Sequence, residues 1–235
     1  MMYSYKSRIK YSEIDHTGHL TFLALMDYFQ DCSILQSIAV GLDYEHLSTF
    51  QKAWVITGWQ IEVTRYPGLN EEIKVGTFAT GTKGLRSHRN FVLLDNKGEI
   101  LVKADSTWAL IDLKTGRPLR PQPEDVDIYG VSEPLKMSDP WLKIKNAEMV
   151  EEFPSFKVKK GHLDTHQHVN NVKYIQMALG FLPEDCKVVK LRVDYKKAAL
   201  LGDDIFPRLA REHHRTLVEL WGEERPYSLL EFIVK

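Results

Sequence analysis

The chain of 235 residues contains only two cysteines, Cys32 and Cys186, and has no long apolar run and no excess of charge of one sign. Two distant cysteines exclude a disulfide-stapled miniprotein, and a reducing compartment leaves both as thiols. No uncharged stretch approaches the roughly 18 apolar residues of a membrane span. The polar N-terminal stretch lacks the apolar segment of a signal peptide. These absences predict a globular cytoplasmic protein.

Charge and glycine patterns exclude further classes of function. The chain has 31 Lys and Arg against 32 Asp and Glu, so it offers no general basic field to a nucleic acid or to an anionic membrane. Gly81 and Gly84 lack the spacing of a glycine-rich phosphate loop. Hydrophobic residues make up 43% of the chain, enough for a substantial core. We therefore expect no nucleic-acid partner and no nucleotide-binding loop.

An internal repeat is the most informative feature of the sequence. Ile14–Leu20 and Leu163–Val169 share the pattern apolar, Asp, three variable residues, His, apolar, with Asp15 and Asp164 149 positions apart. Each copy leads into apolar residues at helical spacing, from Phe22 to Cys32 and from Val172 to Leu179. Both copies of the motif therefore predict a loop that enters a helix.

The segments after these helices repeat as well. Apolar and polar residues alternate over 59–63 and over 189–193, which predicts half-buried strands. Further strands are expected to start at 71–73 and 203–205 and to cover 85–94, 99–112, 215–221 and 228–234. Six of the ten prolines fall within 118–154, so this stretch predicts an extended or turn-rich linker. We predict two copies of one unit, 1–117 and 155–235, joined by a linker at 118–154.

The second motif carries a resemblance to a known family. The run His162–Ile175 reads His-Leu-Asp-Thr-His-Gln-His-Val-Asn-Asn-Val-Lys-Tyr-Ile and resembles the signature D-x-N-x-H-V-N-N-x-x-Y-I of acyl-ACP thioesterases. Ala53–Ile56, Arg65–Pro67 and Ser106–Trp108 resemble the N-terminal half of that family. The resemblance implies an α+β fold, the tandem or double hot-dog, in which two antiparallel sheets each wrap a central helix.

The same resemblance implies an activity and its requirements. Members hydrolyse the thioester between a fatty acyl chain and acyl carrier protein, a step of fatty acid biosynthesis that needs neither a metal nor an organic cofactor. The partner it implies is acyl carrier protein, and a homodimer stays open. The C-terminal copy would carry the catalytic residues, while the N-terminal copy would shape the pocket for the acyl chain.

Carried over to this sequence, the family's catalytic Asp falls on Asp164 and its catalytic His on His168. Two positions depart from the pattern. His166 replaces the Asn that follows the Asp by two residues, and Ala198 stands where the family has a catalytic Glu. Ala199 stands where a nucleophilic Cys has been proposed. The missing Glu predicts modest activity.

The residues themselves support this chemistry. A thioester has a good thiolate leaving group, so its hydrolysis chiefly needs an activated water and a stabilised oxyanion. A histidine such as His168 can accept a proton near neutral pH, and Asp164 could orient it or share the role of base. A helix that begins near Val169 or Asn170 would direct backbone amides at a carbonyl oxygen. We assign catalysis to Asp164, His168 and His166, and substrate binding to Val169, Asn170 and Asn171.

Several of these residues also have a structural interpretation. Asp164 is typical of a turn, and Asn170 or Asn171 of a helix N-cap, which is the role we favour for the two asparagines. His166 is either catalytic or a solvated loop residue. For Asp15 and His19, the same motif in the first copy, we expect a structural role.

The histidines of the second motif and the fold implied by the resemblance also suggest other functions. His162, His166 and His168 alternate along one loop, yet no Cys or acidic cluster accompanies them, so we predict no metal site. The alternatives are an acyl-CoA thioesterase, an enoyl-thioester hydratase or dehydratase, and an acyl-binding module without turnover. Hydratases of this fold commonly use a D-x-N-P-x-H loop, and Gln167 occupies the place of its proline.

A carrier protein is acidic, so its docking patch should be basic. The candidate side chains flank the second motif and the strands that follow it, and they are Lys157, Lys159, Lys160, Lys196, Lys197, Arg208, Arg211 and Arg215.

Overall fold

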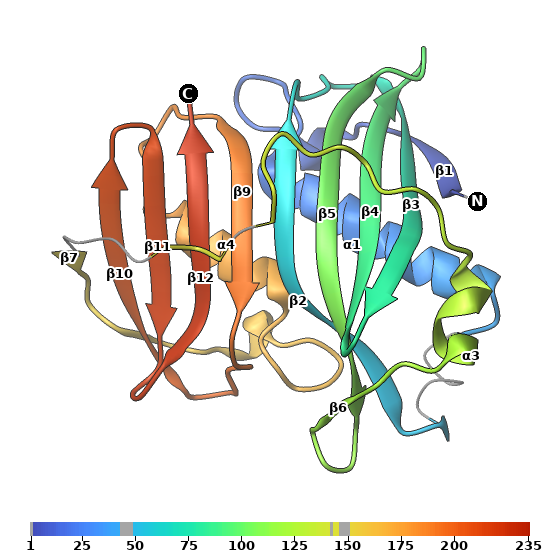
Figure 1. Cartoon of the computed structure of the whole chain (residues 1–235). Helices are drawn as coiled ribbons and strands as arrows, with labels where there is room; N and C mark the ends of the chain where they lie inside the picture. Colours follow the sequence, from blue (N-terminus) through green and yellow to red (C-terminus); the bar gives the residue numbers. More distant parts are fainter. Residues whose placement is uncertain (1, 43–48, 142, 146–150) are drawn as a thin grey trace. The chain divides into compact units, whose positions relative to one another are not determined.

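The structure is a computed structural model that describes residues 2–42, 49–141, 143–145 and 151–235. The chain forms two compact units (Figure 1), one of residues 1–57 and 61–139 and one of residues 58–60 and 140–235. The boundary near residue 139 lies inside the stretch 118–154. The exact limits of the two repeats and of the linker stay a prediction.

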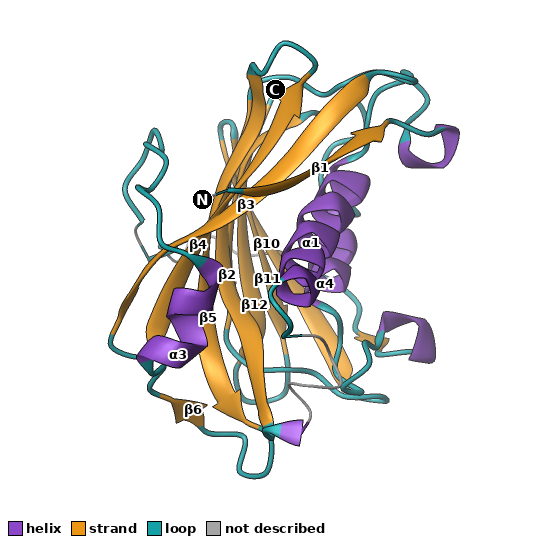
Figure 2. Ribbon diagram, turned by 90° about the vertical axis from the view of Figure 1, so that its right-hand side faces the viewer, coloured by secondary structure: helices purple, strands orange, loops and turns teal. Residues whose placement is uncertain are grey.

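The first unit is a curved antiparallel sheet with one long helix. Its strands are β1 (Tyr3–Arg8), β2 (Lys52–Val63), β3 (Glu72–Lys83), β4 (Arg86–Asp95) and β5 (Ile100–Asp112), in the order β1-β3-β4-β5-β2. Helix α1 (Phe22–Ala39) runs along one face of this sheet (Figure 2). The ring of Phe29 on α1 lies 5.2 Å from that of Phe91 on β4, between ring centroids.

The helix is held by its apolar residues and by its first turn. Leu25, Met26 and Phe29 are fully buried, and each such side chain stabilises the fold by roughly 1.5–3 kcal/mol. The hydroxyl of Thr21 accepts the Ala24 N–H at 3.1 Å and caps the N-terminus of α1. The predicted loop-to-helix transition is thus confirmed in the first copy.

The second unit repeats this plan in a shorter form. Helix α4 (Asn171–Leu179) follows the motif, and the strands are β9 (Val188–Tyr195), β10 (Asp204–Glu212), β11 (Arg215–Trp221) and β12 (Pro226–Val234). The sheet order is β9-β12-β11-β10-β7, with antiparallel pairing throughout and the short β8 also against β10. Tyr174 and Ile175 of α4 and Phe232 of β12 are among its fully buried side chains. The predicted strands are confirmed, although several begin or end a few residues away from the expected limits.

Residues 118–139 of the predicted linker belong to the first unit and are tied down by polar contacts. The predicted linker contains β6 (Pro118–Leu119), α3 (Pro123–Val126), a 3-10 turn at Asp127–Tyr129 and β7 (Glu151–Glu152), and β8 (Phe156–Lys157) follows it. The helical turn α3 was not expected; it starts with Pro123, whose missing N–H costs nothing at a helix N-terminus. The Leu135 N–H donates to Asn90 Oδ1 at 2.7 Å and the Ser138 N–H donates to Glu62 Oε1 at 2.7 Å, which holds the linker against the first sheet.

Two expectations from the absences can be compared with the structure. Among the described residues, no helix is long and apolar enough to cross a membrane. Cys32 and Cys186 are both free thiols, with Cys32 buried and Cys186 half-buried.

Candidate active site

The second motif forms a tight loop in front of α4. A 3-10 turn at Lys160–His162 leads into a short bridge in which Leu163 pairs with Val169. The Asp164 N–H donates to the His168 carbonyl at 2.8 Å, and the Gln167 N–H donates to the Asp164 carbonyl at 3.1 Å. The loop therefore has a fixed backbone conformation before any side chain is considered.

Asp164 organises this loop through its carboxylate. Its Oδ1 accepts the backbone N–H of His166 at 2.8 Å and that of His168 at 3.2 Å. This is the local hydrogen bonding by which Asp stabilises turns. In the part of the chain that the structure describes, no hydrogen bond joins the carboxylate to the His168 ring. The expected contact between Asp164 and His168 is therefore formed through the backbone of His168, not through its imidazole.

His168 presents its side chain to solvent at the end of the loop. The residue is exposed, and its backbone pairs with Leu200 in an isolated bridge. Within the described residues, no hydrogen bond is made by its ring. The side chain is thus held at its base and open at its tip, an arrangement that suits proton transfer with a water or a substrate.

The other two histidines of the motif have different surroundings. His162 is half-buried, and its Nδ1 accepts the Lys159 N–H at 3.1 Å. Burial lowers the pKa of His162, and the nearby charges of Lys173 and Lys159 lower this pKa further. His166 is exposed on the same loop. No group of three His, Cys, Asp or Glu side chains among the described residues is close enough together to hold a metal ion.

Most backbone N–H groups at the start of α4 are already hydrogen-bonded within the protein, which limits the groups that could donate to an oxyanion. Asn170 is the N-cap, and its Oδ1 accepts the Val172 N–H at 2.8 Å, as favoured from the sequence. The Asn170 N–H donates to His162 O at 2.9 Å, the Val169 N–H to Ala199 O at 3.0 Å, and the Lys173 N–H to Asn170 O at 2.9 Å. Within the described chain, the amide of Asn171 is left as the first-turn donor that a bound carbonyl oxygen could meet.

A second segment, residues 196–203, lies beside the motif loop and was not foreseen as a unit. Ala199 is fully buried; its carbonyl accepts the Val169 N–H, and its own N–H donates to the Tyr174 hydroxyl at 2.8 Å. Ala198, at the position of the family's Glu, is exposed one residue earlier on this clamped segment. Tyr174 is the Tyr of the signature, and its contact with Ala199, 25 positions away, could not be predicted from the sequence.

The first motif has the same backbone geometry but a different set of side chains. The Asp15 N–H donates to His19 O at 2.8 Å, and the Thr17 hydroxyl donates to Asp15 Oδ1 at 2.6 Å. The same hydroxyl lies 3.0 Å from Nδ1 of His19, so the ring of this histidine is bound within its own loop. Hydrogen bonds, chiefly from Thr17 and the His19 amide, outweigh burial and lower the pKa of Asp15.

Comparison with known structures defines the class of the fold. An acyl-ACP thioesterase from Bacteroides thetaiotaomicron superposes with a TM-score of 0.88 and 21% identity, over 100% of this chain and 98% of that one. The 12:0-ACP thioesterase from Umbellularia californica gives a TM-score of 0.86 and 18% identity, over 100% and 97%. The expected tandem hot-dog of the α+β class is thereby confirmed.

Sequence comparison identifies the family. The family model of the acyl-ACP thioesterase N-terminal domain matches residues 1–129, and that of the C-terminal domain matches residues 145–220. The chain belongs to the acyl-ACP thioesterase family. The chloroplastic palmitoyl-acyl carrier protein thioesterase of Gossypium hirsutum is 31% identical over 84% of this chain and 52% of its own length. The chloroplastic oleoyl-acyl carrier protein thioesterase 2 of Arabidopsis thaliana is 25% identical over 86% and 61%. The chain spans about half the length of the first of these relatives.

Proposed function

We propose that the protein hydrolyses the thioester of a fatty acyl-acyl carrier protein and releases a free fatty acid. The observation that carries this proposal is the exposed His168 ring on a loop fixed by Asp164, in a chain of this family. This ring makes no hydrogen bond to the described residues. We infer a place at the end of fatty acid biosynthesis, where the acyl chain leaves its carrier. A cytoplasmic location and a homodimer stay predictions.

His168 is the group that would activate the water. Its imidazole accepts a proton as the water oxygen attacks the thioester carbonyl carbon, and it returns this proton to the departing thiolate of the carrier. The C–S bond breaks and the acid forms. No protein nucleophile is needed, because a thiolate is already a good leaving group.

The other groups hold the reaction in place. Asp164 acts as a positioning residue, because its carboxylate fixes the backbone amide of His168. The Asn171 N–H at the start of α4 would donate to the oxyanion of the tetrahedral intermediate. His166 lies two residues from His168 and would contact the substrate from the same loop.

The test uses purified protein with acyl-ACP substrates and measures the released thiol. We expect His168→Ala to lower kcat/KM by at least about 100-fold, since general-base catalysis contributes roughly 10² to 10⁴. The far-ultraviolet circular dichroism should stay unchanged, because His168 is exposed. Turnover of the variant at the parent rate would contradict the assignment of His168.

A second function, acyl binding without turnover, is favoured by one observation. Ala198 and Ala199 carry no functional group where the family has a carboxylate and a thiol, and Ala199 is fully buried. Binding of an acyl-ACP without release of thiol would support this function over hydrolysis. Enoyl-thioester hydration and acyl-CoA hydrolysis are measured on the same preparation to separate the remaining alternatives.

A further inference from the structure

The two copies of the motif differ most in the charge around them. Lys159, Lys160 and Lys173 surround the second motif, on the 3-10 turn before it and on the first turn of α4. We call these three residues the lysine patch. The carbonyl of His162 accepts the Asn170 N–H, so the 3-10 turn is joined directly to the start of α4. After burial, the charges of Lys173 and Lys159 lower the pKa of His162, so both charges lie near this ring.

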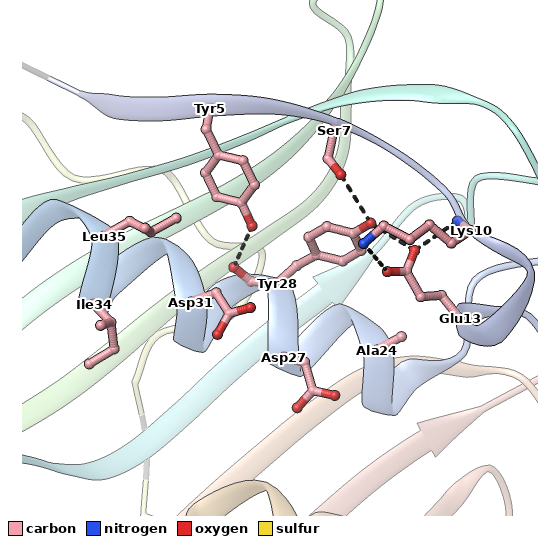
Figure 3. A pocket seen from close by; sticks show the side chains of 10 residues that line it. All are labelled: Tyr5, Ser7, Lys10, Glu13, Ala24, Asp27, Tyr28, Asp31, Ile34 and Leu35. Atoms are coloured by element: carbon pink, nitrogen blue, oxygen red, sulfur yellow. Dashed lines mark hydrogen bonds and ion pairs between the residues drawn. The ribbon is translucent and has the colours of Figure 1, made fainter.

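The corresponding positions of the first copy, 149 residues earlier, are Lys10, Tyr11 and Ala24, with Glu13 in place of His162. Figure 3 shows that Lys10 is already neutralised there, since its Nζ lies 3.2 Å from Glu13 Oε1. Two more acids, Asp27 and Asp31, line the same pocket. Their counterparts in the second copy are Gln176 and Gly180.

At these six aligned positions the first copy has one lysine and three acids, a charge of −2, and the second has three lysines and no acid, a charge of +3. The two surfaces share one backbone framework. Part of the difference is structural, because Glu13 also accepts the Lys10 N–H and the Tyr28 hydroxyl in the first copy, but the framework does not require the three lysines of the second copy. A positive surface beside a reactive histidine attracts an acidic macromolecule and orients it.

Most of the other basic candidates are used within the protein. Lys157 pairs with Asp204 at 2.8 Å, and Arg8 and Glu72 form the same ion pair at the aligned place in the first copy, so this pair belongs to the framework. Lys196 pairs with Asp194 at 3.0 Å. Arg208 pairs with Glu152 and Arg215 with Glu231, at 3.2 and 2.6 Å.

The lysine patch has no such partners. Among the described residues none of its three amines forms an ion pair; the Lys173 Nζ bonds only to the amide oxygen of Gln176, at 3.0 Å. Lys159 and Lys160 are exposed. We propose that the lysine patch is the docking surface for the acidic carrier protein, and that it sets the side from which the acyl thioester reaches His168. This inference rests on the proposed function, because that function names the carrier.

The test places residues of the first copy at the aligned positions of the second. The variant Lys160→Tyr/His162→Glu/Lys173→Ala takes residues that the same framework already holds at 11, 13 and 24, so folding should be kept. Its control, Lys187→Ala/Lys235→Ala, also removes two lysines; both are exposed and lie beside the start of β9, whose eight residues span roughly 26 Å.

We measure the Kd for holo-acyl carrier protein by fluorescence anisotropy. We also measure KM and kcat for acyl-ACP, for acyl-CoA and for acyl-pantetheine. The patch variant should raise Kd and the KM for acyl-ACP about tenfold at low salt. Its kcat and its KM for acyl-pantetheine should change less than about twofold, as should all values of the control. Added salt should remove the difference between parent and variant.

Three results would overturn the docking surface. These are an unchanged Kd, an equal effect of the control, and an equal rise in KM for acyl-CoA, which would mean that the lysines bind the phosphates of the arm and not the carrier protein. Failure of the proposed function is seen separately, as absence of thiol release by the parent protein, and the anisotropy measurement still tests docking in that case.

Discussion

The loop around Asp15 and the loop around Asp164 share one backbone and differ in what their side chains do. In both, the Asp N–H donates to the His carbonyl at 2.8 Å. In both, the residue before the His has a left-handed backbone, with φ of 77° at Gly18 and 62° at Gln167. Both then enter a helix whose N-cap side chain accepts a backbone N–H. This common framework is what the two loops share.

The difference lies in the use of the histidine. Thr17 bonds to both Asp15 and His19, so the first loop satisfies its own polar groups. His166 replaces Thr17 in the second loop, and the His168 ring is left without an internal hydrogen bond among the described residues. The Asp and His of this motif can therefore form a purely structural turn. A catalytic role for the histidine requires that its ring is not hydrogen-bonded within that turn.

The segments that hydrogen-bond to the two loops also differ between the copies. Pro67 accepts the Leu20 N–H in the first copy, and Ala199 accepts the Val169 N–H in the second. Proline has no N–H, whereas the amide of Ala199 needs an acceptor, which the Tyr174 hydroxyl supplies. Leu25 occupies the place of Tyr174 in the first copy. The first copy thus combines Pro67 with Leu25, and the second copy combines Ala199 with Tyr174.

The largest gain in activity is expected from adding the family's carboxylate to the second copy. Ala198→Glu places a carboxylate on the segment clamped beside His168, and we expect kcat with acyl-ACP to rise at least about tenfold, since a positioned acid–base group contributes up to roughly 10² to 10⁴. Ala198→Gln has nearly the same size without the charge and should leave kcat near the parent value. A carboxylate that changes nothing would contradict the placement of the family's Glu at Ala198.

A smaller effect is expected from the Tyr174 clamp. Tyr174→Phe leaves the buried Ala199 N–H without its acceptor and should lower the free energy of unfolding by about 1–3 kcal/mol, measured by urea denaturation. Tyr195→Phe serves as the control, because the Tyr195 hydroxyl donates to the Asn171 carbonyl at 2.9 Å and no N–H loses its acceptor.

Adding Ala199→Pro to Tyr174→Phe removes the amide that the hydroxyl served, as Pro67 does in the first copy. The double variant should then be more stable than expected from the sum of the two single changes. Simple additivity of the two changes would mean that the hydroxyl does not act through the Ala199 amide.

The smallest effect concerns the backbone of the two loops. Gln167 adopts a positive φ that costs a side chain about 1 kcal/mol and costs glycine little. Gln167→Gly should raise the free energy of unfolding by up to about 1 kcal/mol, and Gly18→Gln should lower it by a similar amount, both by urea denaturation. Equal and opposite changes in the free energy of unfolding would show that a positive φ costs the same in the two loops. A loss of stability in Gln167→Gly would contradict this.

The sequence predicted the parts of this molecule that local pattern determines. The repeat of Asp15 and Asp164, the helices after them and the strand Arg215–Trp221 follow from periodicity, because buried faces repeat at 2 or 3.6 residues. Which backbone amides at the start of α4 are already hydrogen-bonded could not be predicted from the sequence. The Val169 N–H donates to the carbonyl of Ala199, 30 positions along the chain, and a local sequence pattern does not predict such a non-local hydrogen bond. The charge difference around the two loops can be read from the 149-residue offset of the repeat, whereas the pairing of each charged side chain, such as Lys10 with Glu13, comes from the structure.

We propose that only the second copy carries the reaction, whereas the first copy keeps the same backbone framework without catalysing it. The most direct test is to measure kcat/KM for one acyl-ACP with His168→Ala and His19→Ala in parallel. The account predicts a loss of at least about 100-fold for His168→Ala and less than about twofold for His19→Ala. Equal losses in the two variants, or a larger loss for His19→Ala, would contradict it.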